Sequence, residues 1–177
     1  MNNTQCILDA LRIATDTKAF ELGEGVLHRA PALFREHFPD RKALIVADNN
    51  TWKAAGEAVD VHMREAGVPC ERFLFEEEEF HADYPYVERI DEALDRTGAV
   101  IIAVGSGVIN DLCKLASFHH DQSYLCVATA ASVDGYSSSG AVVTRDGAKL
   151  NVETRAPRVI LADVGVLAAA PKAMTAA

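Results

Sequence analysis

The chain has 177 residues, of which 49% are hydrophobic and 24% are charged, and its formal net charge is −9. This size and composition indicate one globular domain with a sizeable core. The negative charge argues against nucleic acid or an anionic membrane as a partner, because either would repel such a surface. No apolar run approaches the ~18 residues of a membrane span, and the N-terminus lacks the basic start of a signal peptide, so we expect a cytoplasmic protein.

The first third of the chain alternates between helical and extended patterns. The spacing of apolar residues predicts a helix over 4–13, an edge strand over 18–23, a helix over 26–38 and a central strand over 42–47. Thr51 is interpreted as the N-cap of the next helix, which runs over 52–66. Gly67 is expected to end that helix.

Asp48 closes the predicted strand over 42–47 and permits two readings. A carboxylate at the carboxyl end of a parallel strand can accept hydrogen bonds from both ribose hydroxyls, and its charge would repel a 2′-phosphate. It can equally be a turn or capping residue before Asn49-Asn50-Thr51. The residue chemistry alone favours neither reading.

The middle of the chain predicts a strand over 70–75, an acidic loop at 76–79 and a helix around 87–94. Consecutive glutamates in a loop lack the convergent geometry that a cation needs. The acidic run therefore indicates a solvated surface and not a metal site.

The clearest functional signal follows the unbroken apolar run over 99–104, which predicts a parallel strand buried on both faces. Gly105-Ser106-Gly107 comes next and leads into a helix over 108–116. Glycines let backbone N–H groups approach a phosphate closely, and a helix N-terminus adds unsatisfied donors and a partial positive charge. The turn is thus a candidate anion site, although Gly-x-Gly also occurs in turns that bind nothing.

A second buried strand over 124–128 leads into the small, hydroxyl-rich loop 129–135. Because the carboxyl ends of parallel strands meet at one edge of a sheet, this loop and the glycine turn are expected to line one crevice. The glycine turn follows Asp48 by 57 residues, from 48 to 105. The usual dinucleotide fingerprint places its acidic residue about 20 residues after the glycines, so a standard fingerprint is disfavoured.

The last third predicts a hairpin around Asp146-Gly147, with strands at 141–144 and 149–153, then a core strand over 157–162 and a short helix up to 170. The fold class is therefore α/β, a single domain with a mostly parallel sheet of about six strands. The four cysteines are far apart and form no Cys-x-x-Cys pair, which favours reduced thiols.

Two segments in combination resemble the sn-glycerol-1-phosphate dehydrogenase family, within the superfamily of iron-containing alcohol dehydrogenases, glycerol dehydrogenases and 3-dehydroquinate synthases. One is Asp48 to Gly56, and the other is Gly105 to Lys114 with the loop 129–135 downstream. The resemblance implies a Rossmann-like domain with flanking helices, the N-terminal domain of the dehydroquinate synthase-like fold. It implies an enzyme that reduces dihydroxyacetone phosphate to sn-glycerol 1-phosphate with NADH or NADPH, using zinc or nickel to polarise the carbonyl.

Carried over residue by residue, the resemblance implies three sets of cofactor contacts and one substrate contact. Asp48 would hold the adenosine ribose, and Asp134 would contact the small phosphorylated substrate. The pyrophosphate would lie on Gly105, Ser106, Gly107, Val108 and Ile109, and the nicotinamide side would be lined by Thr129, Ala130, Ala131, Ser132 and Ser138.

The resemblance also implies a second domain. Residues 1–170 would form the dinucleotide-binding domain, and residues 171–177 would begin a helical domain whose metal-binding Asp and two His lie beyond Ala177. No His-x-x-His spacing in this chain replaces those ligands. We therefore expect neither metal ligands nor catalytic residues in this chain, and no turnover by it alone.

Other functions stay open at this stage. A polyol dehydrogenase or a 3-dehydroquinate synthase-like enzyme could use the same scaffold, because fold does not determine substrate. A non-catalytic nucleotide-binding module is a third reading. A phosphorylated substrate would need basic groups, for which Lys149 is the candidate that the sequence offers, and a homodimer is not excluded.

Overall fold

The computed structural model describes residues 3–77 and 81–172, without the side chains of Asn3, Thr4 and Asp134. The strands are β1 (Ala19–Gly23), β2 (Ala43–Asp48), β3 (Cys70–Phe75), β4 (Val100–Gly105), β5 (Leu125–Ala128), β6 (Gly140–Arg145), β7 (Ala148–Glu153) and β8 (Val159–Asp163). The α-helices are α1 (Asn3–Ile13), α2 (Ala30–His37), α3 (Asn49–Thr51), α4 (Glu57–Glu65), α5 (Tyr84–Thr97), α6 (Gly107–His119) and α7 (Val164–Ala168). Single turns of 3₁₀-helix form η1 (Val26–Arg29) and η3 (Asp134–Ser137), and η2 (Trp52–Gly56) is π-helical.

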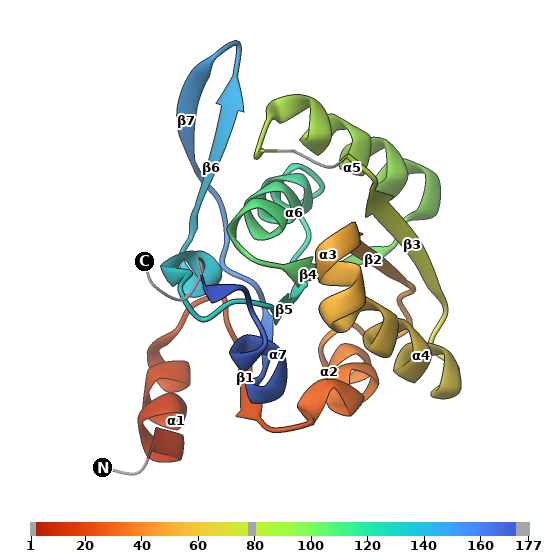
Figure 1. The fold of residues 1–177 in the computed structure, drawn as a ribbon, viewed down its shortest axis with the longest axis vertical. Coiled ribbons are helices and arrows are strands. Elements are labelled where there is room, and N and C mark those ends of the chain that lie inside the picture. Colours follow the sequence, from red (N-terminus) through yellow and green to blue (C-terminus); the bar gives the residue numbers. More distant parts are fainter. Residues whose placement is uncertain (1–2, 78–80, 173–177) are drawn as a thin grey trace.

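Six strands form one sheet in the order β1-β8-β5-β4-β2-β3. Every neighbouring pair in this sheet is parallel. The predicted α/β fold with a mostly parallel sheet of about six strands is therefore confirmed. β6 and β7 form a separate antiparallel hairpin, also as predicted, which turns at Asp146 and Gly147 with φ of 52° and 77°. Figure 1 shows this hairpin extending away from the sheet.

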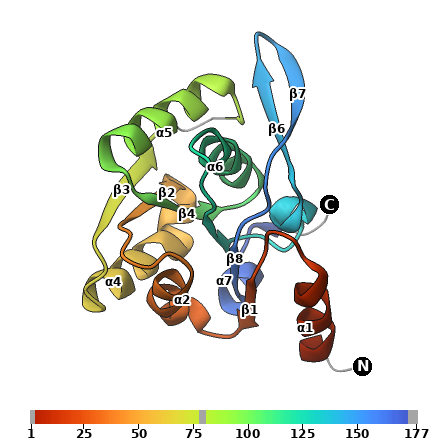
Figure 2. The ribbon, with the colours of Figure 1, turned by 180° about the vertical axis from the view of Figure 1, so that it is seen from behind.

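Helices cover both faces of the sheet, and the period-2 alternation of the strands assigns a separate core to each face. In β2, Ile45 packs with α2 and α4, whereas Leu44 and Val46 pack with α5 and α6. Figures 1 and 2 show these two helix pairs on opposite sides of the central strands. Ala141 and Val143 of the hairpin join the second core beside α6.

The connections after β2 and β4 leave the sheet on opposite faces. The chain goes from β2 through α4 to the outer strand β3, and from β4 through α6 to β5 on the other side. The two neighbouring strands therefore end in loops that separate, which opens a crevice at their carboxyl ends. Asp48 ends β2 and Gly105 ends β4, so both lie at this crevice.

The helix after β2 begins earlier than predicted. Asp48, not Thr51, is the N-cap: its carboxylate accepts hydrogen bonds from the backbone N–H groups of Asn50 and Thr51 at 2.7 and 2.8 Å. The Thr51 hydroxyl accepts the Asp48 backbone N–H at 3.0 Å in return, which completes a capping box. The predicted Thr51 cap is wrong because the stronger acceptor three residues earlier takes the terminal donors.

Candidate nucleotide-binding site

A cavity of about 590 Å³ lies at the carboxyl ends of the central strands. Three of the residues assigned to the cofactor line it from different strands: Asp48 after β2, Ser106 after β4 and Thr129 after β5. The helical segment after β2 and the chain around α7 supply the remaining walls, through Asn50, Thr51, Lys53, Ala54, Val166, Ala169, Ala170 and Pro171. Sequence positions up to 123 residues apart, from 48 to 171, thus meet at one opening.

Asp48 uses one carboxylate oxygen for the helix and leaves the other unused. Oδ1 accepts both capping hydrogen bonds, while Oδ2 makes no hydrogen bond to any residue in the described ranges. The capping reading of Asp48 is therefore confirmed. The ribose reading is compatible with it, because the second oxygen is still an acceptor at the wall of the cavity.

The two glycines of the turn have different surroundings, and neither has a positive φ. A Cβ added to Gly105 would lie 2.4 Å from Cβ of Ile109, so Gly105 lets α6 pack closely on β4. A Cβ added to Gly107 would meet only Val133, at 4.0 Å. Gly107 is therefore not needed for packing, and its missing side chain leaves open space at the start of α6.

The first turn of α6 presents unpaired backbone donors. Ser106 is the N-cap, but its side chain makes no capping hydrogen bond, and the first N–H to bond inside the helix is that of Asn110, to Ser106 O at 2.9 Å. The N–H groups of Gly107, Val108 and Ile109 precede it and have no acceptor within the helix. Ile109 is 1% exposed, so it can contact a ligand only through its backbone.

Tyr136 holds the loop after β5 against the glycine turn, a role that the sequence did not indicate. Its hydroxyl accepts the Ala130 backbone N–H at 3.3 Å and lies 3.2 and 3.1 Å from the carbonyl oxygens of Gly105 and Ala130, to which it can donate. The Thr129 N–H adds a hydrogen bond to Gly105 O at 3.3 Å. Burial raises the pKa of Tyr136 to about 12, so the hydroxyl keeps its proton.

Lys114 fixes the next part of this loop, and sequence reasoning missed it. Its side chain is 1% exposed, and its ammonium donates to Gly135 O at 2.9 Å, Ser138 Oγ at 3.2 Å and Gly140 O at 3.0 Å. Burial lowers the pKa of Lys114, and the charge of Asp111 acts in the opposite direction. The helix α6 therefore carries both the unpaired N–H groups at its N-terminus and Lys114, which anchors the loop.

The other predicted contacts lie around the cavity and do not line it in the described part of the chain. Ala130 is buried under Tyr136, and Ala131 and Ser132 are exposed at the tip of the loop. Ser138 is held by Lys114, and the side chain of Asp134 lies outside the described residues. Lys149 is exposed on β7, away from the residues that line the cavity.

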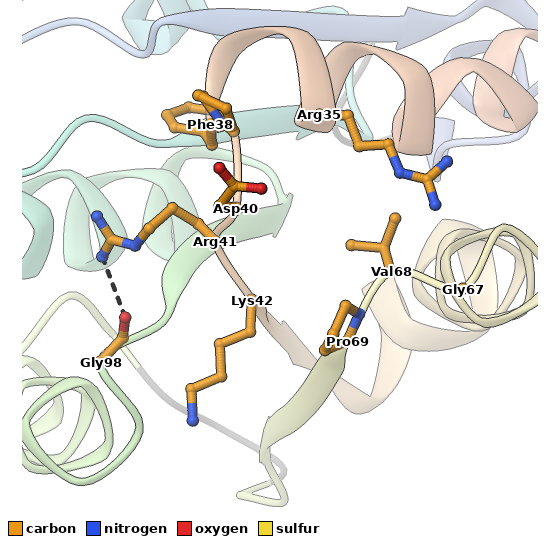
Figure 3. Close-up of a pocket in the computed structure, with 10 residues that line it drawn as sticks. Arg35, Phe38, Asp40, Arg41, Lys42, Gly67, Val68, Pro69 and Gly98 are labelled. Atoms are coloured by element: carbon orange, nitrogen blue, oxygen red, sulfur yellow. Dashed lines mark hydrogen bonds between the residues drawn. The ribbon is translucent and has the colours of Figure 1, made fainter.

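A larger cavity, about 760 Å³, lies at the opposite edge of the sheet and is a poorer candidate for an anion. Its walls come from segments that precede β2, β3 and β4, where helices end and present carbonyl oxygens. Two arginines of this cavity already donate hydrogen bonds to such carbonyl oxygens. Arg35 donates to Ala66 O, and Arg41 donates to Gly98 O at 3.0 Å (Figure 3). These arginines therefore stabilise helix ends.

The described residues do not fit a metal ion, because no three His, Cys, Asp or Glu side chains among them form a site that could hold one. The adjacent His119 and His120 both approach Asp91, at 2.8 and 3.3 Å, and these contacts connect the end of α6 to α5. No helix within 3–77 and 81–172 is long and apolar enough to cross a membrane.

The parallel sheet, its crevice between β2 and β4 and the free N-terminus of α6 define a doubly wound α/β domain. Residues 21–171 match the family described as iron-containing alcohol dehydrogenase, and the chain belongs to this family.

The curated relatives agree with the resemblance found in the sequence. The chain is 36% identical over 136 residues to the glycerol-1-phosphate dehydrogenase [NAD(P)+] of Halalkalibacterium halodurans, a match that covers 75% of this chain and 34% of the relative. It is 34% identical over 151 residues to the enzyme of the same name from Methanosarcina acetivorans, covering 85% and 41%. The chain thus spans between a third and a half of the length of these relatives.

Solved structures show the same fold at low sequence identity. NADH-dependent butanol dehydrogenase A from Thermotoga maritima aligns with a TM-score of 0.80 at 15% identity, covering 92% of this chain and 46% of that one. A 2-deoxy-scyllo-inosose synthase complexed with carbaglucose-6-phosphate, NAD+ and Co2+ aligns with a TM-score of 0.73 at 20% identity, covering 88% and 45%. The Rossmann-like domain of the dehydroquinate synthase-like fold is thereby confirmed.

Proposed function

We propose that this chain is the NAD(P)-binding part of a dehydrogenase that interconverts dihydroxyacetone phosphate and sn-glycerol 1-phosphate. The observation that carries the proposal is a cavity lined both by Asp48, which keeps one carboxylate oxygen unused, and by Ser106, the N-cap of α6, whose first-turn N–H groups have no acceptor within the helix. Its volume of about 590 Å³ is within the ordinary range for cofactor sites. The names of the curated relatives support the same cofactor and substrate.

In this proposal the chain's own residues bind and orient the cofactor. Asp48 Oδ2 accepts the hydroxyls of the adenosine ribose, and the N–H groups of Gly107 to Ile109 with the Ser106 hydroxyl hold the pyrophosphate. Thr129 and the loop that Tyr136 and Lys114 hold lie on the nicotinamide side. The bound cofactor supplies or accepts the hydride, and Asp134 orients the substrate.

The assignment of residues 1–170 as the dinucleotide-binding domain belongs to the same proposal. We also propose a cytoplasmic location and metal ligands that are supplied by a following helical domain. The described residues form no metal site. A glycerol-1-phosphate dehydrogenase is favoured over a polyol dehydrogenase because the relatives of that name match by sequence, whereas a glycerol dehydrogenase structure aligns at 21% identity and shows the fold alone.

Two measurements test the proposal. The fluorescence of NADH titrated with the 177-residue chain should saturate and be reversed by ADP-ribose, and no saturable binding would exclude the cofactor assignment. In the full-length protein, NADH oxidation should depend on dihydroxyacetone phosphate and yield sn-glycerol 1-phosphate. Faster turnover of unphosphorylated dihydroxyacetone would favour the polyol dehydrogenase reading instead.

A further inference from the structure

Lys53 is the one cation among the residues lining the 590 Å³ cavity in the described part of the chain. Its side chain is exposed, and no hydrogen bond or ion pair joins it to another described residue. It shares the cavity wall with Asp48, the carboxylate assigned to the adenosine ribose. A free ammonium therefore lies on the part of the cavity where the ribose would bind.

The local backbone explains why Lys53 faces the cavity. The helix that Asp48 caps runs through α3 into the π-helical turn η2, and Asn50, Lys53 and Ala54 have the i, i+3 and i+4 spacing of one helix face. All three line the cavity. The preceding side chain, Trp52, packs against the core on the other side. Single π-helical turns occur frequently at functional sites.

Lys53 makes no interaction with another described residue that would stabilise the fold. A cation close to a helix N-terminus gains nothing from the helix dipole, which favours anions there. Neighbouring polar groups are already engaged: the Thr51 hydroxyl completes the capping box, and the Asn49 amide donates to Glu76 O at 3.4 Å.

We propose that Lys53 binds the 2′-phosphate of NADP(H) and thereby lets the cavity accept both NADP(H) and NAD(H). This inference rests on the proposed function. A carboxylate that binds the ribose normally selects against NADP(H), because its charge repels a 2′-phosphate attached to the same ring. The capping donors of Asn50 and Thr51 already offset part of the Asp48 charge, and the ammonium of Lys53 offsets the rest.

The test compares NAD+ with NADP+, and 5′-ADP with adenosine 2′,5′-bisphosphate, in calorimetric titrations of the 177-residue chain at low salt. The two adenosine nucleotides isolate the ribose end, since they carry no nicotinamide. The variants are Lys53→Ala, Lys53→Arg and the control Lys149→Ala, which removes the same charge from the exposed face of β7.

Lys53→Ala should lose about tenfold in affinity for NADP+ and for the 2′,5′-bisphosphate, with NAD+ and 5′-ADP within about twofold of wild type. Lys53→Arg should retain NADP+ binding, and Lys149→Ala should bind like wild type. Wild-type protein that binds NAD+ but not NADP+, or a Lys53→Ala variant with an unchanged NADP+ to NAD+ ratio, would overturn the inference and leave the proposed function intact. Failure of all four nucleotides to bind wild type would instead contradict the proposed function.

Discussion

Asp48 combines a structural and a proposed functional role in one carboxylate. Oδ1 accepts the terminal N–H groups of the helix at 2.7 and 2.8 Å, which fixes the orientation of the side chain. A rigidly held acceptor loses little conformational entropy when it binds a ligand. The cap therefore fixes the position of Oδ2, the oxygen that we propose binds the ribose.

The two roles can be separated by substitution at Asp48. Asparagine also caps helices well, so Asp48→Asn should unfold close to the wild-type temperature, whereas Asp48→Ala should lose about 0.5–2 kcal/mol of stability. Both variants should bind NADH about tenfold more weakly, because a charged acceptor contributes about 1.5–3 kcal/mol. Thermal unfolding and NADH titration of the two variants measure each role, and wild-type NADH affinity in Asp48→Asn would remove the ribose assignment.

Lys114 is expected to determine the order of the loop that it anchors. Lys114→Met keeps the volume of the side chain but removes the charged donor to the carbonyl oxygens of Gly135 and Gly140, which keep only neutral donors from Asn110 and Ser138. The variant should lose about 1–3 kcal/mol of stability. Amide hydrogen exchange should become faster across residues 135–140 and stay unchanged in β2. Equal exchange in this loop for Lys114→Met and a Lys149→Met control would show that the anchor is dispensable.

At the scale of elements, the contact of β4 with α6 depends on the absence of a side chain at Gly105. Gly105→Ala would place a methyl group 2.4 Å from Ile109 Cβ, so strand or helix must shift. We expect a loss of about 1–3 kcal/mol in the free energy of unfolding, measured in urea. Gly107→Ala is the matched control and should unfold like wild type, since its added Cβ meets only Val133 at 4.0 Å.

The contact of α4 with β3 should give the domain a pH-dependent component of stability. Burial raises the pKa of Asp60, but the hydrogen bond from Arg72 and the charges of Arg72 and Arg64 lower it more, so that the net shift is below the ordinary value of 3.8. A lowered folded-state pKa means that this stabilisation is complete above pH 3.8 and disappears as the pH falls through the folded-state value.

The variant Asp60→Asn isolates that component. At pH 7 it should be about 1–3 kcal/mol less stable than wild type, and this difference should shrink as the pH is lowered from 4 to 2. Urea unfolding at a series of pH values measures it. A difference that is constant down to pH 2 would show that the carboxylate charge of Asp60 contributes nothing.

The elements were predictable from sequence because their patterns are local. The buried strands, the hairpin at Asp146-Gly147 and the turn at Gly105 follow from periodicity and turn residues. The strand order, with β8 between β1 and β5, depends on pairing between distant segments and has no such pattern. Lys114 was missed for the same reason, since its three acceptors lie 21–26 residues further along the chain.

For the molecule as a whole, cofactor binding and turnover should be separable. The described residues provide the cavity that we propose for the nucleotide but no cluster that could hold a metal ion. The 177-residue chain should therefore bind NADH with or without a chelator, yet not reduce dihydroxyacetone phosphate. Stabilising the charge that develops on the carbonyl oxygen usually requires several kcal/mol from a metal or a fixed donor. An NADH oxidation assay with added zinc or nickel checks this, and metal-dependent turnover would direct attention to His119 and His120.

The proposed function depends most on the start of α6 as the pyrophosphate site, and calorimetric titration of NADH into Gly107→Val tests this directly. A Cβ added at Gly107 meets only Val133, at 4.0 Å, so circular dichroism and thermal unfolding should show a folded domain. The side chain would occupy the space beside the free N–H groups of α6. We predict saturable NADH binding to wild type and none to the folded variant. Equal NADH affinity in the two proteins would contradict the account.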